Sequence, residues 1–148
     1  MEAILDLLAK DHVEFTKILS EIGKLSRGLN KKLLSPEQKF KAMKDIVFII
    51  HKFSIFVGML EKHRELEELT VFKMLEKKGF KNEAKKLRET HVLVANMLKD
   101  LEKEFSEFRE RAKPLEETAA AILKMFMNIR DIFMKHMERE EKIFKKLK

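Results

Sequence analysis

Apolar residues recur at steps of three and four positions along nearly the whole chain, and this spacing constrains the fold more than any other feature of the sequence. Such steps place apolar side chains on one face of an α-helix. The alternation of apolar and polar residues that is typical of a strand does not occur. The sequence therefore predicts an all-α fold, in which each helix is apolar on one face and all helices share one core.

Glycine and proline divide this pattern into four segments. Gly28 is expected to cap the first helix in a left-handed conformation before a loop over residues 29–34, and Gly79 is expected to end the second helix. Residues 35–38, Ser-Pro-Glu-Gln, combine a serine N-cap, a proline in the first turn and a capping-box glutamine. Gly58 predicts a kink or a close contact between helices. The expected helices cover about residues 2–26, 36–78, 82–111 and 114–148.

Four long amphipathic helices with short connections predict an up-down-up-down antiparallel four-helix bundle. The length of 148 residues is that of one ordinary domain, so we expect a single domain over residues 1–148. A pure coiled-coil oligomer would need a pattern without these glycine and proline breaks.

The composition excludes several classes of protein. The chain has no cysteine, which excludes disulfides, thiolate catalysis and cysteine-ligated zinc or iron–sulfur sites. No uncharged apolar run approaches the roughly 20 residues that span a bilayer, and charged residues interrupt the apolar N-terminus. We therefore expect no membrane segment and no signal peptide, with a cytoplasmic protein as the default. The net charge of +7 comes from interleaved Lys and Glu residues, which indicates paired surface charges and no nucleic-acid partner.

Four of the five histidines lie on the apolar faces of four different predicted helices: His12, His63, His91 and His136. At about 1.5 Å of rise per residue, all four lie roughly 15 to 21 Å from the same end of the bundle. Buried imidazoles without partners are costly, so four of them at one level need a common explanation. A bound metal provides one.

Two carboxylates complete the pattern. Glu67 follows His63, and Glu140 follows His136, at a spacing of four residues that places each carboxylate on the same helix face as its histidine. Six side chains spread over about 9 Å of helix axis suit two metal ions bridged by carboxylates better than one ion. The predicted ligands are His12, His63, Glu67, His91, His136 and Glu140.

Three further residues lie close to this pattern but outside it. His51 precedes His63 by twelve residues, so it lies about 18 Å further along the axis and on a different face, and we expect it at the surface or between helices. Glu68 and Glu141 each lie one residue beyond a proposed ligand and are rotated off the core face. We expect them to orient neighbouring helices or the ligands themselves.

Residues 63–68 and 136–141 both have the pattern H-x-x-x-E-E, and a phenylalanine follows each, Phe72 and Phe144. Together with the single His12 and His91, they resemble the hemerythrin-like (HHE cation-binding) domain family over essentially the full chain. Ferritin-like di-iron bundles are a near competitor, but they use Glu-x-x-His, and no such pair lies on the core faces here. The resemblance implies a four-helix bundle with a non-haem di-iron centre.

Residue by residue, the resemblance implies one iron at His12 and His63, a second at His91 and His136, and bridges from Glu67 and Glu140. The chain departs from the oxygen-carrying members at Ala95, where they have a second histidine, and at its last carboxylate, which is Glu at i+4 where they have Asp at i+5. Each octahedral iron would then keep roughly two positions open for a small ligand.

These features predict a protein that binds two iron ions and binds or reacts with oxygen or a related small ligand, such as nitric oxide or peroxide. The expected roles are sensing, iron handling or stress response, and the expected partner is a small diatomic or anionic ligand. Histidine and carboxylate ligands also suit manganese, zinc and copper. The alternative is a helical interaction bundle in which the metal is structural or absent.

Overall fold

The computed structural model describes residues 1–29, 32–33 and 35–148. These residues form five helices: α1 (Glu2–Gly28), α2 (Pro36–Leu69), α3 (Val71–Lys77), α4 (Lys81–Glu110) and α5 (Leu115–Leu147). No strand occurs in the described part of the chain, so the all-α prediction is confirmed. Among the same residues, no helix combines the length and the apolar character that a membrane span requires.

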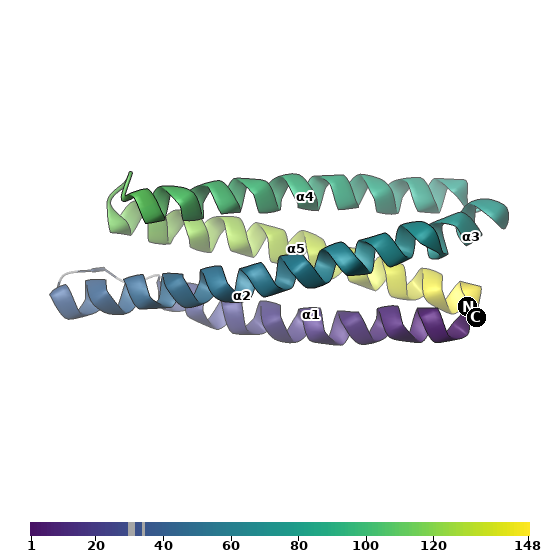
Figure 1. The fold of residues 1–148 in the computed structure, drawn as a ribbon, viewed down its shortest axis with the longest axis horizontal. Helices are drawn as coiled ribbons and strands as arrows, with labels where there is room; N and C mark the ends of the chain where they lie inside the picture. The colour runs from purple at the N-terminus through teal and green to yellow at the C-terminus, as the bar shows by residue number, and fades with distance from the viewer. Residues whose placement is uncertain (30–31, 34) are drawn as a thin grey trace.

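The four long helices lie side by side in an elongated molecule, with both termini at the same end (Figure 1). α1 packs against α2 and α5, and α4 packs against α5. The short helix α3 lies at the end that holds the termini, whereas α1 is joined to α2, and α4 to α5, at the opposite end (Figure 1). This arrangement is compatible with the predicted bundle.

The helix that was predicted to run from residue 36 to residue 78 is broken at Thr70, so that prediction was wrong. Thr70 has φ −128° and ψ −74°, which lies outside the helical region. Its hydroxyl donates a hydrogen bond of 2.6 Å to the carbonyl oxygen of Leu66. A hydroxyl that bonds to its own helix competes with the helical backbone pattern. The chain restarts as α3, whose apolar side chains Phe72 and Leu75 are buried.

The left-handed cap predicted at Gly28 was also wrong, and so was the close helix contact that was one of the two interpretations of Gly58. Gly28 is the last residue of α1 itself, and the C-cap Leu29 has right-handed dihedral angles. The left-handed residues of the described chain are Gly79 and Arg111. Part of the loop predicted over residues 29–34 lies outside the described residues. Gly58 lies within α2, and a Cβ added there would meet no atom within 4 Å, so it makes no close helix contact.

The predicted start of α2 is confirmed in detail. The Ser35 hydroxyl accepts a hydrogen bond of 3.1 Å from the backbone N–H of Gln38. The Gln38 side-chain oxygen accepts one of 3.0 Å from the backbone N–H of Ser35. This reciprocal capping box satisfies two of the backbone donors that a helix leaves open at its N-terminus.

The apolar interior is divided into two clusters of buried side chains. One contains Phe15, Phe56 and Phe133, and the other contains Leu8 and Phe144, close to the chain termini. On each long helix, one histidine lies between members of the two clusters in the sequence. The buried polar residues at this boundary are His12, His63, Glu67, His91, His136 and Glu140. A polar layer therefore interrupts the core where the sequence predicted a metal site.

The backbone at the two open glycines predicts opposite effects of one substitution. Neither Gly58 nor Gly79 has an atom within 4 Å of an added Cβ, but Gly79 has φ +88° whereas Gly58 is helical. Gly79→Ala should lower the free energy of unfolding by about 1 kcal/mol, because a side chain is strained in this region. Gly58→Ala should raise it by about 0.5 to 1 kcal/mol, because alanine favours a helix interior. Urea unfolding measures both, and effects of the same sign would contradict the assignment.

Candidate metal centre

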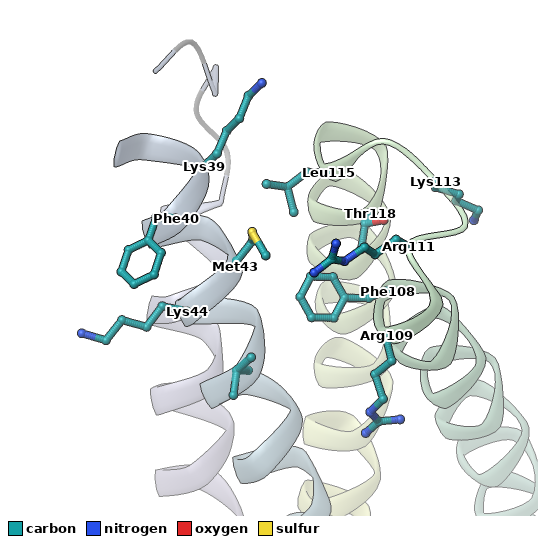
Figure 2. A pocket seen from close by; sticks show the side chains of 11 residues that line it. Lys39, Phe40, Met43, Lys44, Phe108, Arg109, Arg111, Lys113, Leu115 and Thr118 are labelled. Carbon is teal, nitrogen blue, oxygen red and sulfur yellow. The ribbon is translucent and has the colours of Figure 1, made fainter. Parts of the chain in front are cut away.

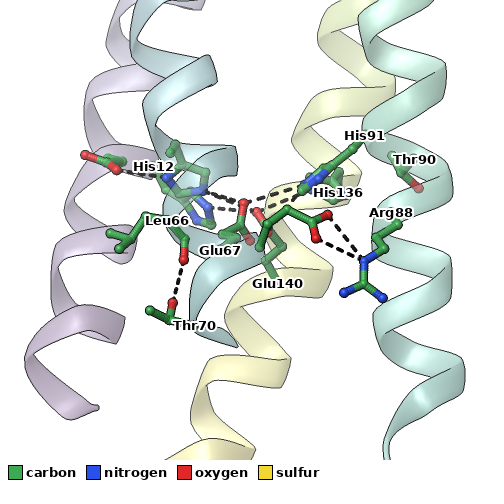
Figure 3. Close-up of polar contacts among 12 residues, drawn as sticks. His12, Leu66, Glu67, Thr70, Arg88, Thr90, His91, His136 and Glu140 are labelled. Carbon is green, nitrogen blue, oxygen red and sulfur yellow. Dashed lines mark hydrogen bonds and ion pairs between the residues drawn. The ribbon is translucent and has the colours of Figure 1, made fainter. Parts of the chain in front are cut away.

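Six buried side chains from four helices meet in the polar layer, and five of them are labelled in Figure 3. α1 contributes His12 and α4 contributes His91. α2 contributes His63 and Glu67, and α5 contributes His136 and Glu140. None of the six is more than 5% exposed. The structure thus brings together all the residues that the sequence singled out as ligands.

The imidazoles form two pairs. The rings of His12 and His63 have centroids 5.1 Å apart, and those of His91 and His136 have centroids 4.8 Å apart. We call these the first and the second histidine pair. The pairs correspond to the two metal positions that the family resemblance implies.

Glu140 reaches both histidine pairs. Its Oε1 lies 3.1 Å from Nε2 of His12, 3.7 Å from Nε2 of His63 and 3.4 Å from Nε2 of His136. Its Oε2 lies 4.0 Å from Nε2 of His91. Within the described residues, two groups have donor atoms close enough to hold a metal ion, and both include Glu140: His12–His63–Glu140 and His91–His136–Glu140.

Glu67 also lies between the pairs, although it belongs to neither of those groups. Its Oε1 is 3.1 Å from Nε2 of His63 and 3.5 Å from Nε2 of His91. Each of the two carboxylates therefore contacts one or more imidazoles of each pair. Such a position suits a carboxylate that bridges two cations, and the ligand role of all six residues remains a prediction.

The hydrogen bonding of the cluster provides a test of whether these residues fit a metal. Among the described residues, six buried atoms of the cluster have no hydrogen-bond partner: Nε2 of His63, Oε1 and Oε2 of Glu67, Nδ1 and Nε2 of His136, and Oε2 of Glu140. Each unsatisfied buried polar atom lowers the stability of the folded protein by about 1 to 3 kcal/mol. Six such atoms in one cluster therefore call for a partner that satisfies them. Imidazole nitrogens and carboxylate oxygens are donors to iron, manganese, zinc and copper, so the residues present fit such an ion.

The protonation of the cluster also favours a cation. Burial lowers the pKa of His136 to about 3, and the adjacent His91 contributes to the decrease. Burial alone would raise the pKa of Glu67, but its contacts with His63 and His91 outweigh burial and lower the pKa to about 2. At neutral pH the site therefore holds a charged carboxylate beside an imidazole with a free lone pair.

Two carboxylates hold the outer nitrogens of the first histidine pair. Nδ1 of His12 lies 3.2 Å from Oε1 of Glu141, as expected from the position of Glu141 beside a ligand. Nδ1 of His63 lies 2.8 Å from Oδ2 of Asp11, a residue that the sequence analysis did not identify. In the sequence, only its position next to His12 draws attention to Asp11. The side chain is seen to reach His63 only when α2 is packed against α1.

The other neighbours behave as expected. His51 is exposed on α2, which confirms that it lies at the surface. Glu68 accepts hydrogen bonds from Nε of Arg88, and Arg88 also donates to Glu76 at 2.7 Å. The Arg88 guanidinium lies 5.1 Å from the centre of the Phe72 ring. Glu68 thus joins α2 to Arg88 of α4, which also binds α3 through Glu76, and this agrees with the predicted role of Glu68 in orienting helices.

Two pockets differ in their distance from the cluster. A pocket of about 690 Å³ lies between the start of α2 and the connection from α4 to α5, with Met43, Phe108 and Leu115 in its lining (Figure 2). None of the six clustered residues lines it. A smaller pocket of about 330 Å³ between α1 and α5 is lined by His12 and Glu141. The buried cluster with this smaller opening is therefore the candidate functional site.

Comparison with known families agrees with this geometry. The family model described as the hemerythrin HHE cation binding domain matches residues 3–147, so the chain belongs to that family. No curated protein and no solved structure matched the chain in the corresponding comparisons.

The low pKa of His136 predicts how the metal-free protein responds to acid. The unfolded chain takes up a proton at His136 near its ordinary pKa of 6.5, whereas the folded chain does so only near 3. The free energy of unfolding should therefore fall as the pH is lowered from 6.5 towards 3, by up to about 1.4 kcal/mol per pH unit from this residue. Urea unfolding of His136→Gln protein, prepared with a chelator, should show a shallower pH dependence. Equal slopes for the two proteins would contradict the assignment.

Proposed function

We propose that this protein is a single-domain, up-down-up-down four-helix bundle that binds two iron ions and binds or reacts with a small ligand such as oxygen, nitric oxide or peroxide. The observation that carries the proposal is the placement of two buried carboxylates, each in contact with both histidine pairs. When bound, an iron pair supplies redox chemistry and open coordination positions for such a ligand. Sensing, iron handling and stress response are the roles that this chemistry serves.

In this proposal, the protein holds the ions with His12, His63, Glu67, His91, His136 and Glu140. Each imidazole ring lies close to a phenylalanine ring. The centroid distances are 5.8 Å for His12 and Phe144, 5.1 Å for His63 and Phe15, 5.3 Å for His91 and Phe72, and 6.2 Å for His136 and Phe133. These rings exclude water and restrict the rotation of the imidazoles, which keeps the ligand atoms directed at the centre.

The pocket between α1 and α5 supplies a route for a small ligand. Its lining includes His12 on one side and Met134 and Met137 on the other, with Glu138 and Glu141 among its polar residues. Two carboxylates near an opening repel anions and leave neutral molecules unaffected. Of the two expected kinds of partner, the pocket therefore favours a neutral diatomic ligand over an anion.

The central prediction is the stoichiometry. Protein expressed with added iron should contain two irons per chain, and its oxidised form should absorb in the near ultraviolet. Glu67→Ala and Glu140→Ala should each lose most of the metal, because each carboxylate contacts both histidine pairs. Metal analysis and optical spectra in air provide the measurement.

Two control variants each remove one side chain outside the cluster, a carboxylate in one and an imidazole in the other. Glu65→Ala changes an exposed glutamate on α2, two residues before Glu67, and His51→Ala changes the exposed histidine of the same helix. Both variants should keep two irons. One tightly held metal with no second site at saturation would contradict the bridged arrangement, and protein without any metal would favour the helical interaction bundle.

A second prediction concerns oxygen. Ala95 follows His91 by one helical turn on α4 and is half-buried, so no further imidazole is present at this position of the second pair. With fewer protein ligands than a carrier, the reduced protein should be oxidised by air and should not hold oxygen reversibly. The spectrum of anaerobically reduced protein is recorded after air is admitted and again after oxygen is removed. Return of the reduced spectrum in the last step would indicate carriage instead.

A further inference from the structure

The two histidine pairs differ in what holds their outer nitrogens. In the first pair, Nδ1 of His12 is bound by Glu141 and Nδ1 of His63 is bound by Asp11. In the second pair, Nδ1 of His136 is buried without a hydrogen-bond partner among the described residues. No described side chain forms a hydrogen bond with Nδ1 of His91 either. Carboxylate support is therefore confined to one pair.

This difference has a direct chemical consequence. A carboxylate that accepts a hydrogen bond from Nδ1 keeps the proton on that nitrogen and leaves the lone pair of Nε2 directed at the centre. It also fixes the orientation of the ring and makes the imidazole a stronger donor to a cation. Loss of such a partner typically weakens metal binding by about 10- to 100-fold. His91 and His136 have no support of this kind from the residues that the structure describes.

The positions of the two shared carboxylates, Glu67 and Glu140, also distinguish the two histidine pairs. The closest approach of Glu67 is 3.1 Å to the first pair, at His63, and 3.5 Å to the second pair, at His91. The closest approach of Glu140 is 3.1 Å to the first pair, at His12, and 3.4 Å to the second pair, at His136. Both carboxyl groups thus lie nearer to the first pair.

We propose that the two metal positions are unequal, with the first metal binding at His12 and His63 and the second at His91 and His136. Asp11 and Glu141 are the positioning residues that cause the difference. This inference rests on the proposed function, because it requires a site for two metals. It adds an order of loading and assigns roles to two residues outside the ligand set.

In the experiment, metal-free protein is titrated with Co²⁺ in the absence of oxygen, and binding is monitored by calorimetry and by visible absorption. Two phases of one ion each are expected. Asp11→Asn and Glu141→Gln should weaken the first phase by about 10- to 100-fold and leave the second almost unchanged. Asp11→Glu, which restores a carboxylate, should recover part of the loss. Circular dichroism checks that each variant is folded.

The matched control is Glu138→Gln. Glu138 is exposed and lines the same pocket as Glu141, but it forms no hydrogen bond or ion pair with a described histidine of the cluster. It carries the same charge, so its removal tests whether the effect of Glu141 is only a general loss of negative charge. Both phases should be unaffected in Glu138→Gln protein.

Two ligand variants identify the order of loading. His91→Ala should keep the first phase and its absorption spectrum, whereas His63→Ala should lose that phase. Two equal phases in the unchanged protein, or equal effects of Glu138→Gln and Glu141→Gln, would overturn the inference and leave the di-metal proposal intact. Absence of any Co²⁺ and Fe²⁺ binding by the unchanged protein would overturn both.

Discussion

The structure depends on one constraint, which is the burial of four imidazoles and two carboxylates in the middle of an apolar bundle. Each of these groups is stable there only if a partner of suitable charge lies within reach. Because they come from four helices, the layer sets the relative height of α1, α2, α4 and α5. A shift of one helix by a single turn would move a histidine into an apolar cluster and leave its partners uncompensated.

The two apolar clusters on either side of this layer help to stabilise it. Phenylalanine rings above and below the layer pack against the imidazoles, so that the polar side chains lie between rigid walls. Within the layer, the histidines differ in how readily they take up a proton. Burial would lower the pKa of His63, but Glu67 and Asp11 outweigh burial and raise it. Burial lowers the pKa of His12, and the neighbouring His63 adds to the decrease. Protons therefore compensate the layer only in part, and cations can complete the charge balance.

Much of the fold and of the candidate site could be predicted from the sequence, because both depend on helical periodicity. The apolar steps and the capping box located the helices, and the i,i+4 spacing placed Glu67 and Glu140 beside their histidines. The break at Thr70 could not be predicted, since no glycine or proline marks it and the buried residues of α3 decide it. The role of Asp11 was missed for a related reason. A side chain beside a core face can turn towards either neighbour, and only the packed helices decide which.

The smaller apolar cluster joins the two ends of the chain. Leu5 and Leu8 belong to it together with Ile143, Phe144 and Leu147. Outside it, Lys148 bonds to Asp6 at 2.8 Å across a separation of 142 residues. Chain ends that are held only by such contacts are among the parts of a fold that open at the lowest free energy. This half of the bundle should therefore open locally before the rest of the molecule, and hydrogen exchange would detect such an opening. Since the polar layer borders it, fraying of the chain ends would open this layer to solvent while the rest of the bundle stays folded.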